Sequence, residues 1–561
     1  MTRTRVDFAI VGAGAAGLYT AWRLLDDARR SGARRSVALF EAGATPGGRL
    51  QTWLPAGARA GLRAELGGMR FSSRHRMVNA LVDELGLRDS VVPFPVQGPG
   101  LSRYFRGTRT AAGDTVALGN LYRLAPGQSG YSPEELAVAA IEALLVSEEN
   151  KEALALCTGG TPPDTAADWD ALKPRLRHHG MPLSSLGLWN VLTDLLSYEG
   201  FRFVSDAFGC YYTGANWNAA EALQHIYLDL VHGPHSHYLT LVGGMSSITD
   251  TLHTAIQDLG ADITCSSRLV AFDAGHSGPV TLHLDGAGEA ARVQADHLIL
   301  AVPRSALEQL APTPSFDLAG TPRLRRLVEA VVPCPVEKLL LLYAHRWWED
   351  EGPEGHSVRG GRSVTDLPLH QVYYMRPDGA VDPGDALSSA QDWGVIMATY
   401  DQRATEYWST AHCRPEAGAL RARLKEVGAA IAGADHVDWE PPANARLAGA
   451  AMVAQAKAQL ALLHGLDERE IPDPVVGVCT TWGDAPFGGG WNFWKPGVDV
   501  PAVMKAIRQP LGPRQPVYVV GEAYSATQAW VEGALTSSET VLQHHLGLTR
   551  PNWAQDRSPR C

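Results

Sequence analysis

The sequence lacks any apolar run long enough to cross a membrane. Its longest apolar stretches, at residues 136–146 and 339–343, fall well short of the roughly 18 residues that a membrane span needs. The N-terminus carries Arg3 and Arg5 but leads directly into an expected strand, without the apolar segment and cleavage site of a secretory signal. We therefore expect no membrane partner and no export.

Cysteine is scarce and scattered. The chain has 7 cysteines in 561 residues, and none of them form a C-x-x-C pair. Disulfide frameworks and zinc-binding modules usually show closely spaced cysteines. The pattern therefore indicates reduced thiols, and it predicts a cytoplasmic location.

Clustered basic residues are also missing. The chain has 49 Lys and Arg against 60 Asp and Glu, a net charge of −11, with no sustained basic stripe. Such a field repels phosphate backbones, so nucleic acid is not an expected partner. The 45% hydrophobic content and the 15 Trp, 16 Tyr and 12 Phe predict a packed globular protein. At roughly 150 residues per domain, this length allows about three or four structural units.

A glycine loop near the N-terminus is the first sign of a ligand site. An apolar run at residues 7–11 leads into Gly12-x-Gly14-x-x-Gly17, and apolar residues then recur at helical spacing. This order predicts a strand, a tight turn and a helix whose N-terminus accepts a pyrophosphate. Glu41 ends the next apolar run, where an acid can accept hydrogen bonds from a ribose. The pattern predicts a dinucleotide site and leaves NAD and FAD open.

Later segments indicate that the chain leaves this fold and returns to it. A helical stretch covers residues 133–237, and a further helix follows residue 241. Strands are expected at residues 261–270, 280–284, 296–302 and 517–520 in the nucleotide fold, and at residues 338–343, 371–375 and 394–400 in a separate mixed sheet.

Four further motifs resemble a known family. They are residues 42–49 (AGATPGGR), 65–71 (ELGGMRF), 520–525 (VGEAYS) and 529–534 (AWVEGA). Together with the glycine loop they resemble the flavin-dependent amine oxidase superfamily, and within it the bacterial L-amino-acid oxidases. The resemblance spans nearly the whole chain.

The resemblance implies an α/β fold with three parts. A Rossmann-like FAD-binding domain is assembled from the discontinuous segments 1–55, 240–328 and 510–561. A mixed-sheet substrate-binding domain comprises 56–115 and 329–509, and a helical domain is inserted at 116–239.

The resemblance also implies which residues hold FAD. They are Gly12, Gly14, Ala15, Ala16, Gly17, Glu41, Ala42, Gly48, Arg49, Gly67, Gly68, Met69, Arg70, Leu269, Val270, Gly521, Glu522, Ala529, Trp530 and Val531. No cysteine lies between Tyr524 and Trp530, where covalently flavinylated monoamine oxidases carry their linkage, so FAD is expected to be noncovalent. No metal is expected: His232, His235 and His237 are close together, but no Cys or carboxylate pattern completes a site.

Arg70 is the first candidate catalytic residue. Its counterpart in L-amino-acid oxidases pairs with the substrate carboxylate, and a planar guanidinium can donate two parallel hydrogen bonds to such a group. The alternative is an arginine that pairs with the flavin or with a surface acid. Monoamine and polyamine oxidases need no such partner, so this residue bears on substrate class.

Three more candidates follow from the resemblance. Lys338 would hold a water against flavin N5, and Tyr400 would be the second carboxylate donor, with Thr399 or a core role for the ring as alternatives. Trp530 would form the aromatic wall beside the flavin, or else a core tryptophan. His225 is a candidate histidine near the substrate, and the aromatic loop at residues 488–494 is expected close to the site.

The predicted function is oxidation of an L-amino acid, with Arg70 and Tyr400 fixing the carboxylate while hydride passes from Cα to flavin N5. The imine would hydrolyse to a 2-oxo acid and ammonia, and O₂ would be reduced to hydrogen peroxide. The alternatives are an amino-acid 2-monooxygenase that forms an amide by oxidative decarboxylation, an amine or polyamine oxidase, a nicotinamide-dependent dehydrogenase or flavin-dependent isomerase, and a non-enzymatic FAD-binding protein. A homodimer or higher homo-oligomer is expected, because family members are often dimers.

The substrate side chain stays open at this point. Asp206, Glu221 and Asp229 in the helical region could face a basic side chain, although acids are more often solvated at the surface. Aromatic, aliphatic and basic amino acids are all compatible with the sequence.

Overall fold

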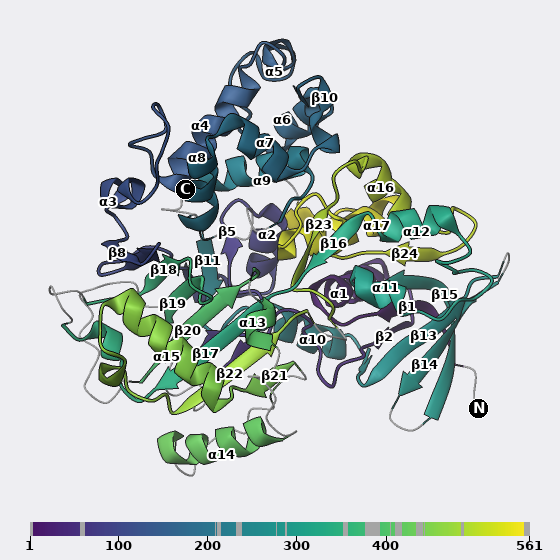
Figure 1. Ribbon diagram of the computed structural model, residues 1–561. Coiled ribbons are helices and arrows are strands. Elements are labelled where there is room, and N and C mark those ends of the chain that lie inside the picture. Colours follow the sequence, from purple (N-terminus) through teal and green to yellow (C-terminus); the bar gives the residue numbers. More distant parts are fainter. Residues whose placement is uncertain are drawn as a thin grey trace.

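The computed structural model describes residues 4–554 except for 56–61, 208, 210–214, 232–237, 276–277, 287–288, 352–356, 376–392, 404, 410–417, 433–440, 442–443 and 484–486. Its two large sheets lie next to each other, and a group of helices lies to one side of them, at the top of Figure 1. The predicted α/β class is confirmed.

The first large sheet has seven strands, and β1 lies in its interior. Its strands are β12 (Ile263–Thr264), β2 (Val37–Phe40), β1 (Thr4–Val11), β15 (Glu289–Leu300), β14 (Val280–Gly286) and β13 (Ser267–Asp273) in that order, with β24 (Val517–Val519) paired to β15. β12, β2, β1, β15 and β24 are parallel, so their carboxyl ends meet at one edge. The strand expected at residues 261–270 is instead two strands, because Ser266 at φ 50° turns the chain between them.

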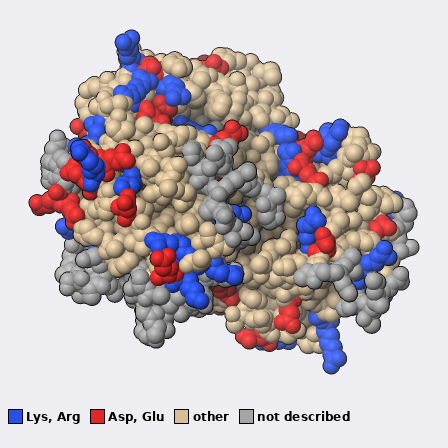
Figure 2. All heavy atoms as spheres, turned by 60° about the horizontal axis from the view of Figure 1, so that its bottom comes forward, with Lys and Arg blue, Asp and Glu red and all other residues tan. Residues whose placement is uncertain are grey.

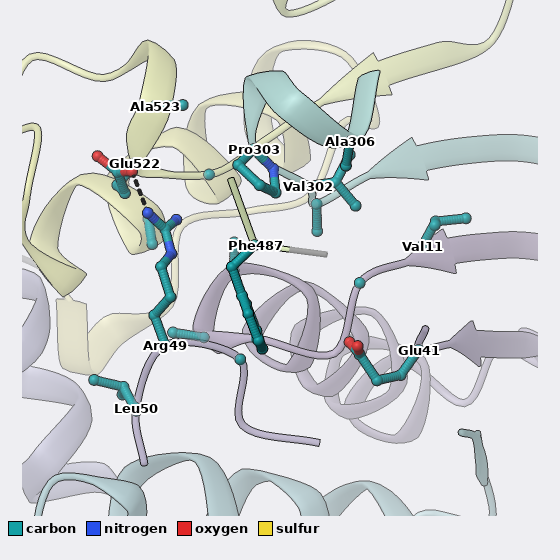
Figure 3. Close-up of a pocket in the computed structure, with 18 of the residues that line it drawn as sticks. Val11, Glu41, Arg49, Leu50, Val302, Pro303, Ala306, Phe487, Glu522 and Ala523 are labelled. Carbon is teal, nitrogen blue, oxygen red and sulfur yellow. Dashed lines mark hydrogen bonds and ion pairs between the residues drawn. The ribbon is translucent and has the colours of Figure 1, made fainter. Parts of the chain in front are cut away.

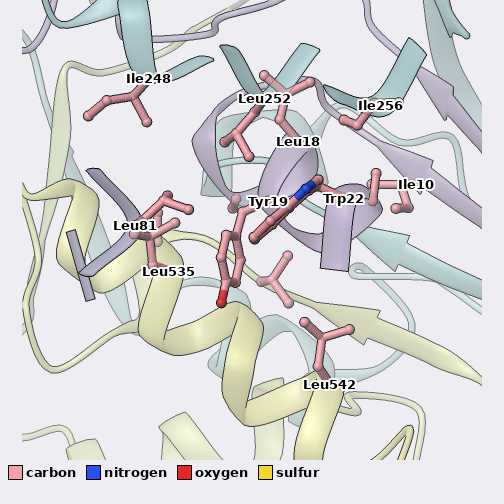
Figure 4. Close-up of a cluster of buried hydrophobic side chains, with 14 of the residues drawn as sticks. Ile10, Leu18, Tyr19, Trp22, Leu81, Ile248, Leu252, Ile256, Leu535 and Leu542 are labelled. Atoms are coloured by element: carbon pink, nitrogen blue, oxygen red, sulfur yellow. The ribbon is translucent and has the colours of Figure 1, made fainter. Parts of the chain in front are cut away.

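Helices cover both faces of this sheet. Ile10 packs into a cluster with α1 (Ala15–Ser31), α10 (Ser246–Asp258), α17 (Val531–His544) and α2 (Arg76–Glu84), part of which is shown in Figure 4. Ala9 and Val11 pack into a second cluster with α11 (Arg304–Glu308), α12 (Pro322–Val328) and α16 (Val500–Ile507). Alternate residues of β1 thus face opposite helical layers, which is why its sequence is almost continuously apolar.

A buried ion pair joins the first and last of these helices. Arg23 Nε of α1 lies 2.7 Å from Glu539 Oε1 of α17, and the Tyr19 hydroxyl donates to the same oxygen at 2.6 Å. The two partners are more than 500 residues apart in the sequence. The C-terminal helix is therefore part of the N-terminal core.

The second sheet has eight strands. In order they are β21 (Ala445–Leu447), β22 (Val476–Thr481), β17 (Glu337–Tyr343), β20 (Gly394–Asp401), β19 (Gln371–Met375), β18 (Gly361–Thr365), β7 (Ser102–Phe105) and β8 (Thr108–Ala111). Its helices are α13 (Thr405–Ser409), α14 (Ala419–Ala432) and α15 (Ala450–His464). The strands expected at 338–343, 371–375 and 394–400 are all present, and the sheet is mixed because β18 and β7 are parallel while its other strand pairs are antiparallel.

Small sheets connect these parts. They are β5 (Phe71–Ser72) with β11 (Tyr238–Leu241) and β6 (Val91–Pro93), β16 (Val331–Cys334) with β23 (Trp491–Trp494), β3 (Thr52–Trp53) with β4 (Ala64–Glu65), and β9 (Arg177–His178) with β10 (Met181–Pro182).

The helical group consists of α3 (Thr115–Asn120), α4 (Pro133–Leu145), α5 (Lys151–Thr158), α6 (Ala166–Leu172), α7 (Leu188–Leu195), α8 (Tyr198–Ala207) and α9 (Ala219–Val231). The predicted domain boundaries stay a prediction.

Charges are interspersed on the face of the molecule shown in Figure 2, where acidic and basic side chains lie among a majority of uncharged ones. Within the described residues, no helix combines the length and the apolar character that crossing a membrane requires.

Candidate active site

A cavity of about 240 Å³ lies where the parallel strands of the first sheet end. Its walls follow the carboxyl ends of β1, β2, β15 and β24 and include the turns after them. The residues that line it are Val11, Gly12, Gly14, Ala15, Ala16, Glu41, Ala42, Gly47, Gly48, Arg49, Leu50, Gly68, Arg70, Ser267, Arg268, Leu269, Leu300, Ala301, Val302, Pro303, Ala306, Gln309, Leu310, Phe487, Gly490, Gly521, Glu522, Ala523, Ala529, Trp530, Val531 and Ala534. Ligands of open α/β sheets bind at this edge.

The glycines of the first loop have different tasks. Gly12 has φ 98°, and a Cβ there would lie 2.5 Å from the Ala301 carbonyl oxygen. A Cβ at Gly17 would lie 1.8 Å from the Gly12 carbonyl oxygen, so this glycine permits the turn and does not line the cavity. Gly14 and Gly521 do line it: a Cβ at Gly521 would meet no atom within 4 Å. A Cβ at Gly14 would lie 3.7 Å from Gly48 Cα. Since neither glycine has a side chain, a ligand in the cavity can approach both backbones closely.

Glu41 stands at the end of β2, as predicted. One carboxylate oxygen accepts from the Ala13 amide and the other from the Gly43 amide, each at 2.7 Å. These two bonds fix the side chain at the cavity wall beside the glycine loop (Figure 3).

Arg49 and Glu522 join the early and late motifs across the cavity. Arg49 Nη1 lies 2.6 Å from Glu522 Oε1, the contact drawn in Figure 3, and it also donates to the Gly490 carbonyl at 3.1 Å. Glu522 further accepts from Asn492 Nδ2 at 2.7 Å and from the Ala529 amide at 3.0 Å. One carboxylate therefore holds together the three segments that carry Arg49, Asn492 and Ala529.

Arg70 is a buried charge between aromatic rings. It is 8% exposed, and its Cζ lies 4.1 Å from the ring centre of Tyr238 and 5.4 Å from that of Phe94. Its Nη1 donates to the Tyr373 hydroxyl at 3.2 Å. Cation–π contacts of this kind hold a guanidinium through its flat face, while the N–H groups lie at its edge.

Trp530 packs against Tyr238 and two histidines. Its ring lies 6.0 Å from that of Tyr238 at 20° and 4.7 Å from that of His75, and its Nε1 donates to His225 Nε2 at 3.4 Å. Burial lowers the pKa of His75 to about 3, with a further contribution from His225. Burial lowers the pKa of His225 to about 4, against the opposing charge of Asp229. Both imidazoles are therefore neutral at neutral pH.

Lys338 and Tyr400 lie behind the cavity wall, on adjacent strands of the second sheet. Lys338 Nζ donates to the carbonyls of Glu65 and Gly67, and it lies 5.1 Å from the Tyr400 ring centre. Burial lowers the pKa of the Lys338 ammonium, which the Glu65 carboxylate partly offsets. Burial likewise raises the pKa of Glu65. The Tyr400 ring lies 6.4 Å from that of Tyr373, the residue that contacts Arg70.

Comparison with known proteins identifies the family. A family model described as flavin containing amine oxidoreductase matches residues 15–541. The chain belongs to this family. It is therefore an oxidoreductase of a flavin-containing family, and the predicted resemblance is confirmed at that level.

Several relatives match along much of the chain. Aplysianin-A of Aplysia kurodai is 27% identical over 561 residues, covering 96% of this chain and 90% of that protein. L-amino acid oxidase Lm29 of Lachesis muta is 24% identical over 65% of this chain and 62% of that protein. A solved putrescine oxidase superposes with a TM-score of 0.62 at 19% identity, over 98% of this chain and 100% of that one, which shows the amine oxidase fold.

Most of the residues predicted to hold the cofactor line the cavity, but some do not. Gly17, Gly67, Met69 and Val270 lie outside the lining, as do the catalytic candidates Lys338 and Tyr400. Gly67 has the same steric task as Gly17, because a Cβ there would lie 2.0 Å from the Arg49 carbonyl oxygen. His232, His235 and His237 lie outside the described residues.

The sequence interpretation missed the stretch from Leu300 to Pro303, which lines the cavity after β15. The sequence could have indicated this stretch. Residues 296–302 were expected to form a parallel strand of the same sheet, and the carboxyl end of such a strand lies beside the carboxyl ends of the others. It also missed Phe487, one residue before the aromatic loop that was expected near the site.

The three acidic residues of the helical region each form an ion pair or a hydrogen bond within the protein. Asp206 is 4% exposed and pairs with Arg202 at 2.8 Å, and Glu221 pairs with Lys173 at 2.8 Å. Asp229 accepts from the Tyr238 hydroxyl at 2.6 Å. Asp229 thus touches the aromatic residue that separates Arg70 from Trp530.

The Arg49–Glu522 contact yields a first test. We expect Glu522→Gln to lower the flavin content of the purified protein, because losing the charged acceptor costs the wall about 1–3 kcal/mol. The measurement is the ratio of flavin to protein absorbance after equal purification. Asp296→Asn, which removes the partner of the exposed Arg5 at 2.6 Å, is the matched control and should leave the ratio unchanged. Equal flavin content in the two variants would contradict the assigned role.

Lys338 yields a pH-dependent test. Its folded pKa is lowered, so between that value and the ordinary lysine value of about 10.4 the unfolded chain binds a proton that the folded chain does not. Stability contributed by this group therefore rises with pH across that range. We expect the melting temperature of wild type, relative to Lys338→Met, to increase as the pH rises from neutral toward about 10. The exposed Lys425→Met should show no such trend, and a pH-independent difference for Lys338→Met would refute the interpretation.

Proposed function

We propose that this chain is an FAD-dependent L-amino-acid oxidase. The observation that carries the proposal is the buried guanidinium of Arg70, which lines the cavity between aromatic rings. A guanidinium at the cavity wall can donate two parallel hydrogen bonds to a planar anion, and an α-carboxylate is such an anion. Relatives named L-amino acid oxidases, such as the one from Lachesis muta, support the same substrate class.

The residues of the cavity fit a dinucleotide. Gly14, the N-cap of α1, lines the cavity without a side chain, so a pyrophosphate could approach the backbone closely there. Glu41 lines the cavity at the end of β2 and would accept hydrogen bonds from a ribose. The Arg49–Glu522 pair closes the cavity wall beside the motif at residues 520–525. FAD would be bound noncovalently, because residues 524–530 contain no cysteine to carry the family's covalent link.

The chain's own residues would bind and orient the substrate. Arg70 would bind the carboxylate, held in place by the Tyr373 hydroxyl and by the ring of Tyr238. Trp530 would exclude water and confine the amine, and the neutral His75 and His225 beside it would add no charge that repels an ammonium group. When bound, FAD would accept the two electrons of the Cα–H bond and pass them to O₂, which yields an imine and hydrogen peroxide.

Tyr400 and Lys338 have supporting tasks in this proposal. The Tyr400 hydroxyl accepts from Gln402 Nε2 at 3.3 Å, and its ring lies 6.4 Å from that of Tyr373. Because Tyr400 does not line the cavity, it would act on the carboxylate site through Tyr373, which bonds to Arg70. Lys338 secures the turn at residues 65–68 through two backbone carbonyls, with Thr480 and Trp482 bonded to the Leu66 carbonyl between them. The position of Arg70, two residues later, depends on that turn.

The deciding experiment is a peroxide-coupled screen of the purified protein. L-amino acids, their D-forms and the matching decarboxylated amines are compared, with 2-oxo acid and amide products quantified. We expect peroxide and an equimolar 2-oxo acid from L-amino acids alone. Amide without stoichiometric peroxide would indicate a 2-monooxygenase, and turnover of amines alone would indicate an amine or polyamine oxidase.

Substitution of Arg70 tests the carboxylate contact directly. We expect Arg70→Met to lower kcat/KM for the L-amino acid by about 100-fold or more, because one partner of a buried charge pair is lost. Any activity on the decarboxylated amine should not fall. Arg29→Met, an exposed arginine of α1, is the control and should behave as wild type. A lower flavin content and melting temperature in Arg70→Met than in wild type would place Arg70 in the fold and not in substrate recognition.

A further inference from the structure

Two histidines and an aspartate meet in the helical group, outside the cavity. His178 belongs to β9, His179 follows it, and Asp194 lies near the end of α7. The Nε2 atoms of His178 and His179 lie 3.2 and 3.5 Å from the same oxygen of Asp194, Oδ2. One ligand atom from each of the three residues lies within 4.8 Å of the others.

The turn between β9 and β10 creates this arrangement. Neighbouring side chains of an extended strand point to opposite faces, which would separate the two imidazoles. His179 has φ 50° and Gly180 has φ 75°, so both residues of the turn are left-handed. The two imidazole ring centres are consequently only 4.2 Å apart. Glycine is the usual residue in such a conformation, and asparagine, aspartate and histidine are the side chains that adopt it most often.

The Asp194 side chain is 49% exposed, and its surroundings also favour a cation. Asp194 is in the last turn of α7, where the helix dipole disfavours a negative charge. Within the described part of the chain, its ion-pair partners are these two imidazoles, which carry charge only when protonated. The His179 side chain is 75% exposed, so the cluster is open to solvent on one side. A bound cation would offset the charge of Asp194 at any pH at which the imidazoles are neutral.

We propose that His178, His179 and Asp194 bind one divalent transition metal ion of the zinc class. Ligand atoms about 2.0–2.1 Å from a tetrahedral zinc lie roughly 3.3 Å from each other, close to the two distances found here. Two imidazoles favour zinc, copper or nickel over magnesium and calcium, which prefer oxygen ligands. Water would take the open position. Because β10 and α7 lie away from the strand ends at the cavity (Figure 1), the metal would tie the hairpin to α7 and take no part in the oxidation.

The test is zinc titration of the untagged, flavin-loaded protein by calorimetry, with cobalt as a spectroscopic probe of tetrahedral geometry. We expect one zinc ion per chain, a raised melting temperature in its presence and no comparable binding of magnesium. His179→Gly removes a ligand and suits the left-handed turn, so it should fold normally. This variant and Asp194→Asn should each bind zinc at least about 10-fold more weakly, since changes in the outer shell alone cost about 10–100-fold.

Two controls separate this site from other histidines. His345→Ala removes the imidazole of an exposed pair, 2.8 Å from Asp350, and should leave zinc affinity unchanged. The triple variant His232→Ala, His235→Ala, His237→Ala should also bind zinc as wild type does. Unchanged affinity in His179→Gly and Asp194→Asn, or loss of binding in the triple variant alone, would overturn the proposal.

Discussion

The ion pair between Arg49 and Glu522 is the contact on which the cavity depends. It joins the turn after the second strand of the first sheet to the turn after its last strand. Because Glu522 also accepts from Asn492 and from the Ala529 amide, the same carboxylate fixes the aromatic loop and the segment that carries Trp530. A second buried carboxylate, Glu539, binds the C-terminal helix to the first helix through Arg23. The cavity can therefore form only when both ends of the chain are in place.

At Arg70 the cost of burying a charge is set against the contacts that the charge makes. A guanidinium loses hydration when it is buried, and the aromatic faces and the Tyr373 hydroxyl help to offset that cost. The neighbouring imidazoles avoid the same cost because burial keeps them neutral. The result is a cavity end with a fixed positive charge beside an uncharged aromatic wall.

Much of the site could be predicted because its motifs are local. The glycine loop and the motifs at residues 42–49, 65–71 and 520–534 each place backbone and side chains within one turn, so spacing alone carries the information. The strands around them were predictable from apolar runs, apart from the break at Ser266, where a left-handed residue interrupts the run. The spacing alone did not show that Gly17 has a steric role, because that role depends on how closely the Gly12 carbonyl oxygen and Ala301 approach it in the folded chain.

The sequence by itself determined the family, the α/β class and most of the cavity wall, since these depend on short motifs and on apolar periodicity. Only the tertiary structure decided which side chains share a contact across long separations. It placed Tyr238 between Arg70 and Trp530, and Lys338 behind the wall instead of in it. It also brought His178 and His179 to Asp194. Such contacts arise from packing between elements that are remote in sequence, and no local pattern records that packing.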